Sequence, residues 1–426
     1  MLWIDLVRRN VRAAEVLSNN GVRGTRRALL AIWLAIEGAD DNIRDLFRGF
    51  DEDRLEADVD AISLAEAFAQ IIPGSAKNTA AKEALLRSLA VCLRALERQL
   101  WSLGGSKVQR REKPAVVEFD GTSAYLLMRA PRHRIAKTED NFRRRGLKKT
   151  RLIPRKIGKL DVRLVFLQDF RGQARLKEQT PLSIAAALFP GIRYIEETVP
   201  EGFVVVDVEF QDQVDVMRRQ IRDASIARCA GIVYPELSIT SQTLAAVRTG
   251  LSNGIWEECE LSMIVAGSRH EADGAGRRFN VCTILDGYGN AIGEHRKLFR
   301  YSEGAGPHEA IELGSELQVL VMAEGLFAFG ICLDFCNLSE RPPYLDLDVD
   351  YVLVPSCGRE STMYSHMARS GEVMTKLKVR TFVVQQYYRK TPEEPGPVGY
   401  VLARVDAVMP ELSSLATSDP WHVHVV

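Results

Sequence analysis

Phe329-Gly330-Ile331-Cys332-Leu333-Asp334 is the stretch of this 426-residue chain on which the fold prediction depends. It closes the apolar run Leu326–Cys332, whose length and composition are typical of a buried β-strand. We predict that this strand turns sharply after its last residue and presents the Cys332 thiol at its end. A cysteine in such a place is often an inert core residue, because the free thiol packs as a small hydrophobe. Whether Cys332 is a core residue or a nucleophile must therefore be judged from the other motifs of the chain.

Strands alternate with helical patterns from Phe203 onward. The Val214–Ala227 segment has helical spacing, and Gly287-Tyr288-Gly289-Asn290 reads as a hairpin turn. This order favours sheets that are flanked by helices. The predicted strands are Phe203–Phe210, Gly231–Tyr234, Leu261–Gly267, Val281–Leu285, Ala291–Glu294, Leu317–Met322, Leu326–Cys332, Tyr351–Pro355 and Thr381–Gln386.

Two further strand ends carry a chemically active side chain. The first is IVYPELS, residues 232–238, where a proline ends the strand and Glu236 follows. The second is RRFNVCTILDGYGNAIGEHRKL, residues 277–298, which places Lys297 after the hairpin. Alone, a glutamate or a lysine is usually a solvated surface group. Three strand ends in the order Glu, Lys, Cys are more specific than any one of them.

In this order, and with DYVLVPS at residues 350–356, these fragments resemble the nitrilase superfamily of carbon–nitrogen hydrolases. The likeness runs from about Phe203 to Tyr388, with 61 residues from Glu236 to Lys297 and 35 from Lys297 to Cys332. It implies a four-layer αββα sandwich, a Glu–Lys–Cys triad, and hydrolysis or acyl transfer at a non-peptide carbon–nitrogen bond. The implied substrate is a small amide or nitrile, the implied assembly is a homo-oligomer, and neither a cofactor nor a metal is implied.

The resemblance assigns the catalytic roles. A thiol with a pKa of about 8.5 is mostly protonated at neutral pH, so it needs a base or a cation beside it. We expect Glu236 to take the proton of Cys332 and later to activate water. We expect Lys297 and the backbone N–H of Leu333 to stabilise the developing oxyanion.

Further site residues are predicted less specifically. The family often has a second glutamate between the Lys and the Cys, and we assign it to Glu309, with Glu312 as the alternative. Cys336 stands where the family commonly has Arg, and Asn337-Leu338-Ser339-Glu340 and Gln385–Tyr388 also depart from the family pattern, which leaves the substrate open. Candidates for the substrate pocket, or otherwise for core or rim, are Tyr301, Phe335, Cys336, Tyr364 and His366.

The chain before these motifs has a different character. Apolar residues recur at helical spacing up to about Gly105, where Gly104-Gly105 ends a helix. We therefore predict a mixed α/β protein: an all-helical N-terminal domain over 1–105, a basic connecting region over 106–160, and the nitrilase-like domain over 161–426.

Positive charge is concentrated in the connecting region. The segment from Lys107 to Lys159 has 17 Lys or Arg and 5 Asp or Glu, in a chain whose net charge is zero. Clustered cations can bind nucleic acid or a protein partner, and a solvated linker can have the same composition. The candidate contacts are Arg143, Arg144, Arg145, Lys148 and Lys149.

Composition narrows the class of protein. Apolar residues make up 46% and charged residues 26%, as in folded globular chains. The seven cysteines include no CxxC pair and no Cys/His cluster at zinc spacing, so reduced thiols are expected. The most apolar run, Ala28–Ile36, is shorter than the roughly 20 residues that span a bilayer. We expect a soluble, cytoplasmic protein with no membrane partner.

Two other hypotheses compete with hydrolysis by the triad. One is a catalytically silent nitrilase-like scaffold that binds a small molecule, nucleic acid or a partner protein, for example in bacterial defence. The other is a Cys–His hydrolase in which His308 or His366 serves as the base for Cys332.

Overall fold

The computed structural model describes residues 2–72, 74, 78–104, 114–128, 146–167, 182–256, 259–302, 306–322, 324–391 and 393–426. These residues form two compact units, Met1–Lys156 and Ile157–Val426. Each unit has a hydrophobic core of its own.

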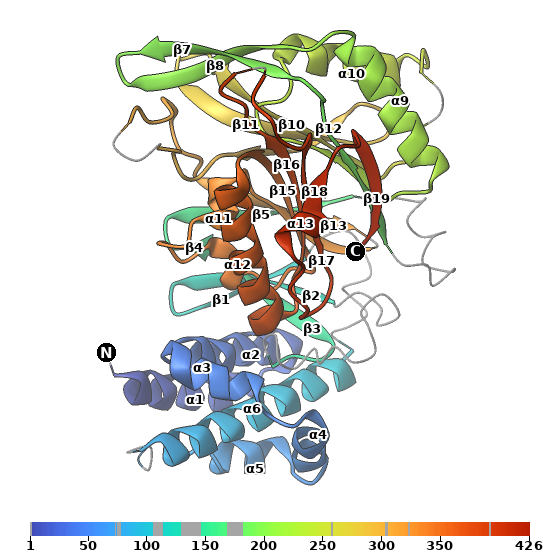
Figure 1. The fold of residues 1–426 in the computed structure, drawn as a ribbon. Coiled ribbons are helices and arrows are strands. Elements are labelled where there is room, and N and C mark those ends of the chain that lie inside the picture. Colours follow the sequence, from blue (N-terminus) through green and yellow to red (C-terminus); the bar gives the residue numbers. More distant parts are fainter. Residues whose placement is uncertain are drawn as a thin grey trace. The chain divides into compact units, whose positions relative to one another are not determined.

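The helices of the first unit share one hydrophobic core with the longest of them, which contacts four of the others (Figure 1). The side chain of Asn78 caps that helix by accepting a hydrogen bond from the Ala81 N–H, and Ser63 and Glu66 form a capping box on a shorter one. The helices are α1 (Trp3–Ser18), α2 (Gly21–Glu37), α3 (Asp41–Arg48), α4 (Glu52–Asp60), α5 (Leu64–Ala69) and α6 (Thr79–Ser102).

A three-stranded antiparallel sheet completes the first unit, which is therefore not all-helical. It consists of β1 (Ala115–Phe119), β2 (Thr122–Met128) and β3 (Thr150–Pro154), all within the segment predicted to be a connecting region. Buried residues of this sheet, such as Val117 and Leu126, belong to the same core as the helices. Because the segment is rich in Lys and Arg, the sequence favoured a connecting region there and did not indicate that its strands form a sheet with a buried apolar face.

A buried ionic cluster joins α6 to β3. The Glu97 carboxylate, 3% exposed, accepts hydrogen bonds from the backbone N–H groups of Lys148, Lys149 and Thr150 at 2.7–2.9 Å and from the Thr150 hydroxyl at 2.7 Å. One turn away, the Arg94 guanidinium donates to the Gly146 carbonyl at 2.6 Å and to Glu56 at 2.7 Å. These contacts compensate charges that would otherwise be costly to bury.

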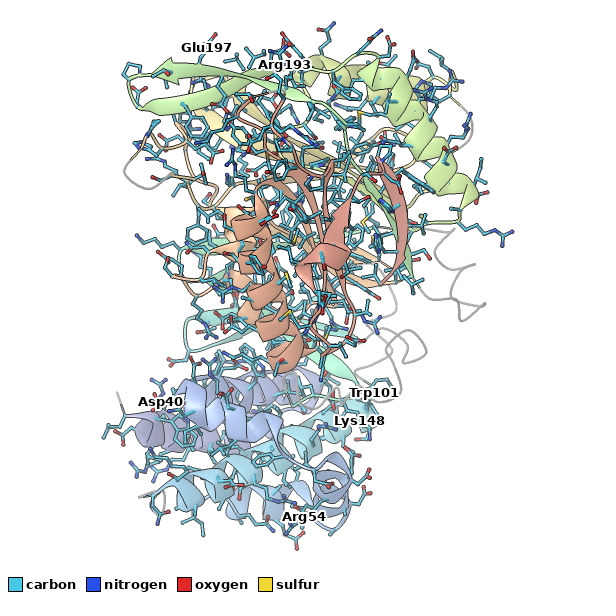
Figure 2. The ribbon with its side chains drawn as sticks, viewed as in Figure 1. Asp40, Arg54, Trp101, Lys148, Arg193 and Glu197 are labelled. Carbon is cyan, nitrogen blue, oxygen red and sulfur yellow. The ribbon has the colours of Figure 1, made fainter. Side chains whose placement is uncertain are left out.

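Two of the predicted nucleic-acid contacts have partners inside this unit. The Lys148 ammonium lies 3.1 Å from the Glu56 carboxylate, and the Lys149 ammonium lies 4.8 Å from the centre of the Trp101 ring. Figure 2 labels Lys148 and Trp101. Arg143, Arg144 and Arg145 lie outside the described residues. Binding through this segment stays a prediction.

The second unit is built on two β-sheets whose side chains fill the space between them (Figure 2). The six-stranded sheet has the order β12 (Ala291–Arg296), β11 (Arg278–Leu285), β10 (Met263–Ala272), β9 (Gly231–Tyr234), β6 (Ser183–Ala187), β19 (Trp421–Val425). The eight-stranded sheet has the order β18 (Ala416–Thr417), β17 (Gly399–Arg404), β16 (Arg380–Tyr387), β15 (Tyr351–Gly358), β14 (Gly325–Phe329), β13 (Glu316–Met322), β5 (Leu160–Phe166), β4 (Lys156–Ile157).

Strand alternation explains the layers. Val233 points into the core between the sheets, whereas its neighbours Ile232 and Tyr234 belong to a second core that includes residues of α9 (Gln213–Ile226) and α10 (Ser241–Ser252). Helix α12 (Glu360–Leu377) packs on β15, β16 and β17 of the other sheet. The order is thus helix, sheet, sheet, helix, and the predicted mixed α/β sandwich is confirmed.

Smaller elements complete this unit. A separate hairpin, β7 (Arg193–Val199) and β8 (Gly202–Glu209), lies beside the loop at 306–311 and is bonded to it by the Phe203 N–H, which donates to the His308 carbonyl at 2.9 Å. The short helices are α11 (Leu333–Cys336), the 3-10 helix Pro343–Leu345 and α13 (Leu412–Leu415). Among the described residues, no helix has the length and apolarity that a membrane span requires.

Candidate active site

Cys332 lies at a strained turn between β14 and α11. Its φ of 44° is in the left-handed region, which is rare for a residue other than glycine. The Cys332 N–H donates to the Pro355 carbonyl of β15 at 2.9 Å, which holds the turn. Gly330 is required just before it, since a Cβ there would lie 2.4 Å from the Tyr344 hydroxyl oxygen. The sharp elbow predicted from the sequence is thus present.

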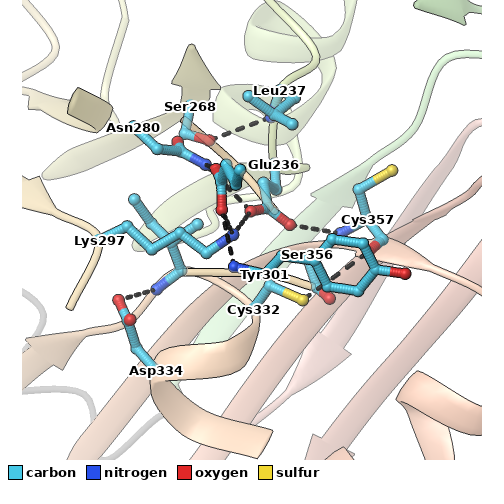
Figure 3. Close-up of polar contacts among 12 residues, drawn as sticks. Glu236, Leu237, Ser268, Asn280, Lys297, Tyr301, Cys332, Asp334, Ser356 and Cys357 are labelled. Atoms are coloured by element: carbon cyan, nitrogen blue, oxygen red, sulfur yellow. Dashed lines mark hydrogen bonds and ion pairs between the residues drawn. The ribbon is translucent and has the colours of Figure 1, made fainter. Parts of the chain in front are cut away.

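Lys297 lies between two carboxylates. Its ammonium donates to Glu236 Oε1 (Figure 3) and to Glu309 Oε2, each at 2.7 Å. All three side chains are at most 3% exposed. An ammonium has three N–H donors, and these two contacts use two of them. One N–H is left for a third group at the same place.

Glu309 is held by four donors. Its Oε2 accepts from Lys297 and from the Tyr301 backbone N–H at 3.1 Å. Its Oε1 is contacted by Asn280 Nδ2 at 2.8 Å and His270 Nε2 at 2.9 Å. Because His270 Nδ1 accepts the Val205 N–H at 2.8 Å, Nε2 is the nitrogen that carries the proton and donates to Glu309.

Glu236 has fewer fixed donors. Its Oε1 accepts from Lys297 and from Asn280 Nδ2 at 3.1 Å, and its Oε2 accepts from the Cys357 backbone N–H at 3.1 Å. The second oxygen therefore keeps capacity for one more proton donor. Asn280 bridges the two glutamates and fixes their separation.

The three charged groups shift one another's pKa values in different directions. Burial raises the pKa of Glu236, and the Glu309 charge adds to that rise, although Lys297 opposes it. Burial would also raise the pKa of Glu309, but Lys297 and His270 hold it well below its usual range. For Lys297, burial would lower the pKa, and the two carboxylates instead raise it well above its usual value. Lys297 and Glu309 are thus a fixed ion pair, and Glu236 is the group suited to exchange a proton.

The Cys332 thiol has a raised pKa. A hydrogen bond with Cys336 is the largest cause, followed by burial and the nearby Glu236 charge. Its Sγ lies 3.7 Å from the Cys357 carbonyl oxygen. The thiol is consequently protonated at neutral pH and requires a base before it can act as a nucleophile.

Asp334 connects the lysine segment to the cysteine turn. Its Oδ1 accepts the backbone N–H groups of Leu298 at 2.7 Å and Phe299 at 3.0 Å, and its Oδ2 accepts that of Ile331 at 3.0 Å. The same Oδ2 lies 2.8 Å from His295 Nε2. Lys297 and Cys332 are therefore positioned against each other by one fully buried carboxylate.

These groups border a cavity of about 420 Å³, a size that suits a small molecule. Glu236, Lys297, Cys332 and Glu309 all reach its wall, together with aromatic and charged side chains. The lining is Tyr194, Glu196, Thr198, Phe203, Val205, Glu236, Leu237, Lys297, Tyr301, Pro307, Glu309, Cys332, Cys357, Gly358, Arg359, Ser361, Thr362, Tyr388 and Lys390.

Tyr301 is the one predicted pocket residue among those that line this cavity. Phe335 is fully buried and stacks on the His366 ring at 6.0 Å, and Cys336 is 4% exposed. Tyr364 is 56% exposed on α12. These four pocket candidates are thus not among the residues that line the cavity.

Leu333 and Glu312 have distinct positions. The Leu333 N–H opens α11 directly after Cys332, and within the described part of the chain no acceptor for it is present. Glu312 is exposed and donates its own N–H to the Arg278 carbonyl, so Glu309 is the glutamate that contacts Lys297.

Sequence reasoning missed several residues of the site. Asn280 stood in the quoted motif, but its link to two glutamates depends on strand pairing. His270 follows a β-bulge in β10, where Gly267 with φ 70° passes the Pro235 carbonyl, and nothing local in the sequence signals its contact with Glu309.

Comparison with known proteins gives matches among solved structures alone, since no family model and no curated protein matches the chain. An amidase from Nesterenkonia sp. is 16% identical, covers 53% of this chain and 83% of its own, and has a TM-score of 0.37. Saccharomyces cerevisiae Nit3, a member of branch 10 of the nitrilase superfamily, is 14% identical, with 52% and 82% covered and a TM-score of 0.38. A glutamine-dependent NAD+ synthetase from Acinetobacter baumannii is 15% identical, with 57% and 45% covered and a TM-score of 0.41. The solved structures to which this chain is similar thus include a member of the nitrilase superfamily.

Proposed function

We propose that the second unit hydrolyses a non-peptide carbon–nitrogen bond, an amide first of all, or transfers the acyl group from it. The observation that carries this proposal is that Cys332, Lys297 and Glu236 border one cavity, with Lys297 bonded to Glu236 at 2.7 Å. A thiol, a carboxylate with a raised pKa and a buried ammonium are the groups that acyl transfer through a thioester requires.

The first half-reaction forms the thioester. Glu236 takes the proton of the Cys332 thiol, and the sulfur adds to the carbonyl carbon of the amide. The oxygen gains a negative charge, which the third N–H of Lys297 and the Leu333 N–H stabilise. When the carbon–nitrogen bond breaks, protonated Glu236 returns its proton to the leaving amine, and the acyl group stays on Cys332.

The second half-reaction releases the acid. Glu236, again ionised, takes a proton from water, and the resulting hydroxide adds to the thioester carbon. The carbon–sulfur bond then breaks and the proton returns to sulfur, which restores the thiol. If an amine or another nucleophile takes the place of water, the same steps transfer the acyl group instead.

Glu309 acts in this scheme by positioning Lys297. Its four donors and lowered pKa make it a permanent anion, so it holds the ammonium charged and fixed without exchanging protons. It is therefore a positioning residue for the oxyanion-binding lysine.

The test is a hydrolysis screen of amides, nitriles, carbamoyl compounds and glutamine on the full chain. We expect turnover of at least one compound, and Cys332→Ala to lower it by about 10⁴-fold or more. Cys282→Ser is the matched control, since Cys282 is buried in β11, away from the cavity lining. Turnover that survives Cys332→Ala would overturn the proposal.

The competing hypotheses give different results. A silent scaffold shows no turnover in the screen and no acyl adduct on Cys332 by mass spectrometry. A Cys–His hydrolase loses activity in His366→Asn or His308→Ala and tolerates Glu236→Gln. His308 is exposed, and neither histidine belongs to the cavity lining.

A further inference from the structure

Cys332 also belongs to a cluster of three residues whose side chains could bind a metal ion. One sulfur each from Cys332 and Cys336 and one ring nitrogen of His366 lie within 4.8 Å of one another, and all three residues are buried. Around a tetrahedral zinc ion, ligand atoms are separated by roughly 3.5–4 Å, because Zn–S is about 2.3 Å and Zn–N about 2.0 Å. The separations in this cluster, at most 4.8 Å, exceed that spacing by no more than roughly 1 Å.

The ring of His366 is held on one side and interacts with Cys336. The ring is fully buried, and its Nε2 lies 2.9 Å from the Ser356 hydroxyl. Its Nδ1 is buried too and has no hydrogen-bond partner among the described residues. A buried nitrogen without a partner is costly, and a metal ion would satisfy it. The contact of the other nitrogen with Ser356 is the kind of outer hydrogen bond that orients metal-binding histidines.

Charge favours a divalent cation here. Two thiolates and a neutral imidazole around one Zn²⁺ ion carry no net charge, so the ion does not leave an uncompensated charge in the interior. Cysteine sulfur and imidazole nitrogen are ligands that zinc prefers, and a fourth position stays open for water. Neither Cys336 nor His366 lines the cavity, so the proposed hydrolysis gives neither of them a direct contact with the substrate.

We propose that Cys332, Cys336 and His366 form a Zn²⁺ site whose occupation blocks the nucleophile. Binding replaces the two thiol protons, which leave to solvent, with Zn–S bonds. The sulfur of Cys332 is then bound to the metal and cannot add to a substrate. The metal is an inhibitor in this proposal, and the inhibitory part rests on the function proposed above.

Zinc binding is tested first, on the reduced full chain, by equilibrium dialysis with Zn²⁺ and by absorption with Co²⁺. We expect about one ion per chain and the intense thiolate-to-cobalt charge-transfer bands of a tetrahedral site. Cys336→Ser and His366→Asn should each weaken Zn²⁺ binding by more than about tenfold. Cys282→Ser, another buried cysteine, should bind as the parent does.

The outcomes separate the two proposals. Absence of stoichiometric Zn²⁺ binding or of the thiolate bands in the parent chain overturns the metal site, whatever the variants do. Equal Zn²⁺ affinity in Cys336→Ser overturns it as well. Dialysis does not depend on turnover, so a failed hydrolysis screen leaves this result readable. Where turnover is found, Zn²⁺ should inhibit the parent chain, and Cys336→Ser should keep its turnover at the same Zn²⁺ concentration.

Discussion

Each unit of this chain buries a charged cluster, and the two clusters differ in what surrounds them. In the first unit, Glu97 accepts four hydrogen bonds from the segment that leads into β3. In the second unit, Lys297 joins Glu236 and Glu309 at the wall of a cavity of about 420 Å³. The Glu97 carboxylate is enclosed by donors of its own unit, whereas Glu236 lines the cavity and its Oε2 accepts one hydrogen bond, from the Cys357 N–H.

This difference distinguishes buried carboxylates that hold other groups in place from a buried carboxylate that can exchange a proton. A buried carboxylate without compensation is expensive, so its position is informative only when its donors are counted. Glu97 and Glu309 each have four donors and serve to hold other groups. Glu236 has three, and its pKa is raised, so it is the carboxylate to which we assign proton transfer.

The largest effect on this comparison is expected from Glu236→Gln. The amide cannot take the Cys332 proton, so we expect kcat/KM to fall by about 10²–10⁴-fold while the fold is retained. Steady-state kinetics and thermal unfolding check both parts. Glu294→Gln, on the surface of β12, is the control and should keep full activity. Near-normal turnover in Glu236→Gln would show that Glu236 is not the base, and the buried carboxylates of the two units would then not differ in chemical role.

The corresponding change in the first unit is Glu97→Gln. It replaces an acceptor of backbone N–H groups by a group that itself donates, so we expect a loss of roughly 2–4 kcal/mol in the free energy of unfolding. Denaturant unfolding followed by circular dichroism measures it. Glu118→Gln, exposed on β1, should change the unfolding free energy by no more than about 0.5 kcal/mol. Equal stability of the two variants would contradict the structural role of Glu97.

Glu309→Gln tests whether the second glutamate acts through Lys297. We expect kcat to fall by roughly tenfold to a hundredfold, because the ammonium loses one of the anions that hold it. The variant should also move the acidic limb of the kcat/KM profile to lower pH, since the Glu309 charge contributes to the raised pKa of Glu236. An unchanged limb with reduced kcat would limit Glu309 to a packing role.

The pH dependence of kcat/KM in the unmodified chain tests the assignment of Glu236 as the base, and its expected effect is smaller than that of the substitutions above. Glu236 must be ionised to accept the thiol proton, so activity is lost as pH falls through its pKa. Because burial raises that pKa, the acidic limb of kcat/KM should lie above the value of about 4.3 that is usual for glutamate. A limb at or below that value would mean that another group is the base.

The smallest effect is expected from Lys148→Ala. The Lys148 ammonium pairs with Glu56 at 3.1 Å, with both side chains about 30% exposed, so the pair should contribute at most about 1 kcal/mol to the stability of the first unit. Denaturant unfolding at low and high salt measures it. A larger loss of unfolding free energy would show that Lys148 belongs to the buried ionic cluster of Glu97 and Arg94.

The sequence predicted those parts of the site that depend on where strands end. Glu236, Lys297 and Cys332 each lie shortly after the end of a strand, and these three strand ends lie close together in the sandwich. It could not predict Asn280 or His270, because their contacts with Glu309 depend on register and on a β-bulge between strands.

The fold of the second unit was predicted better than that of the first, again because local patterns do not show which distant strands pair. Alternation of strands and helices after Phe203 indicated the sandwich, since each element buries a regular apolar face. In the first unit, the sequence indicated strand-like stretches at 116–119 and 125–128 but not the sheet, because β3 pairs with β2 across more than 20 intervening residues and the basic composition between them favoured a linker interpretation. Local patterns identify elements and do not identify their distant partners.

The hairpin of β7 and β8 has a consequence for engineering. Val205 of β8 is bonded to His270, which in turn holds Glu309, so changes in β8 propagate to the lysine. Tyr194, Glu196 and Thr198 line the same cavity from β7. Tyr194 is bonded to the Cys357 thiol, whose N–H holds Glu236, so under the function proposed above a library that varies Glu196 and Thr198 and preserves Tyr194 and β8 is the design for changing substrate preference.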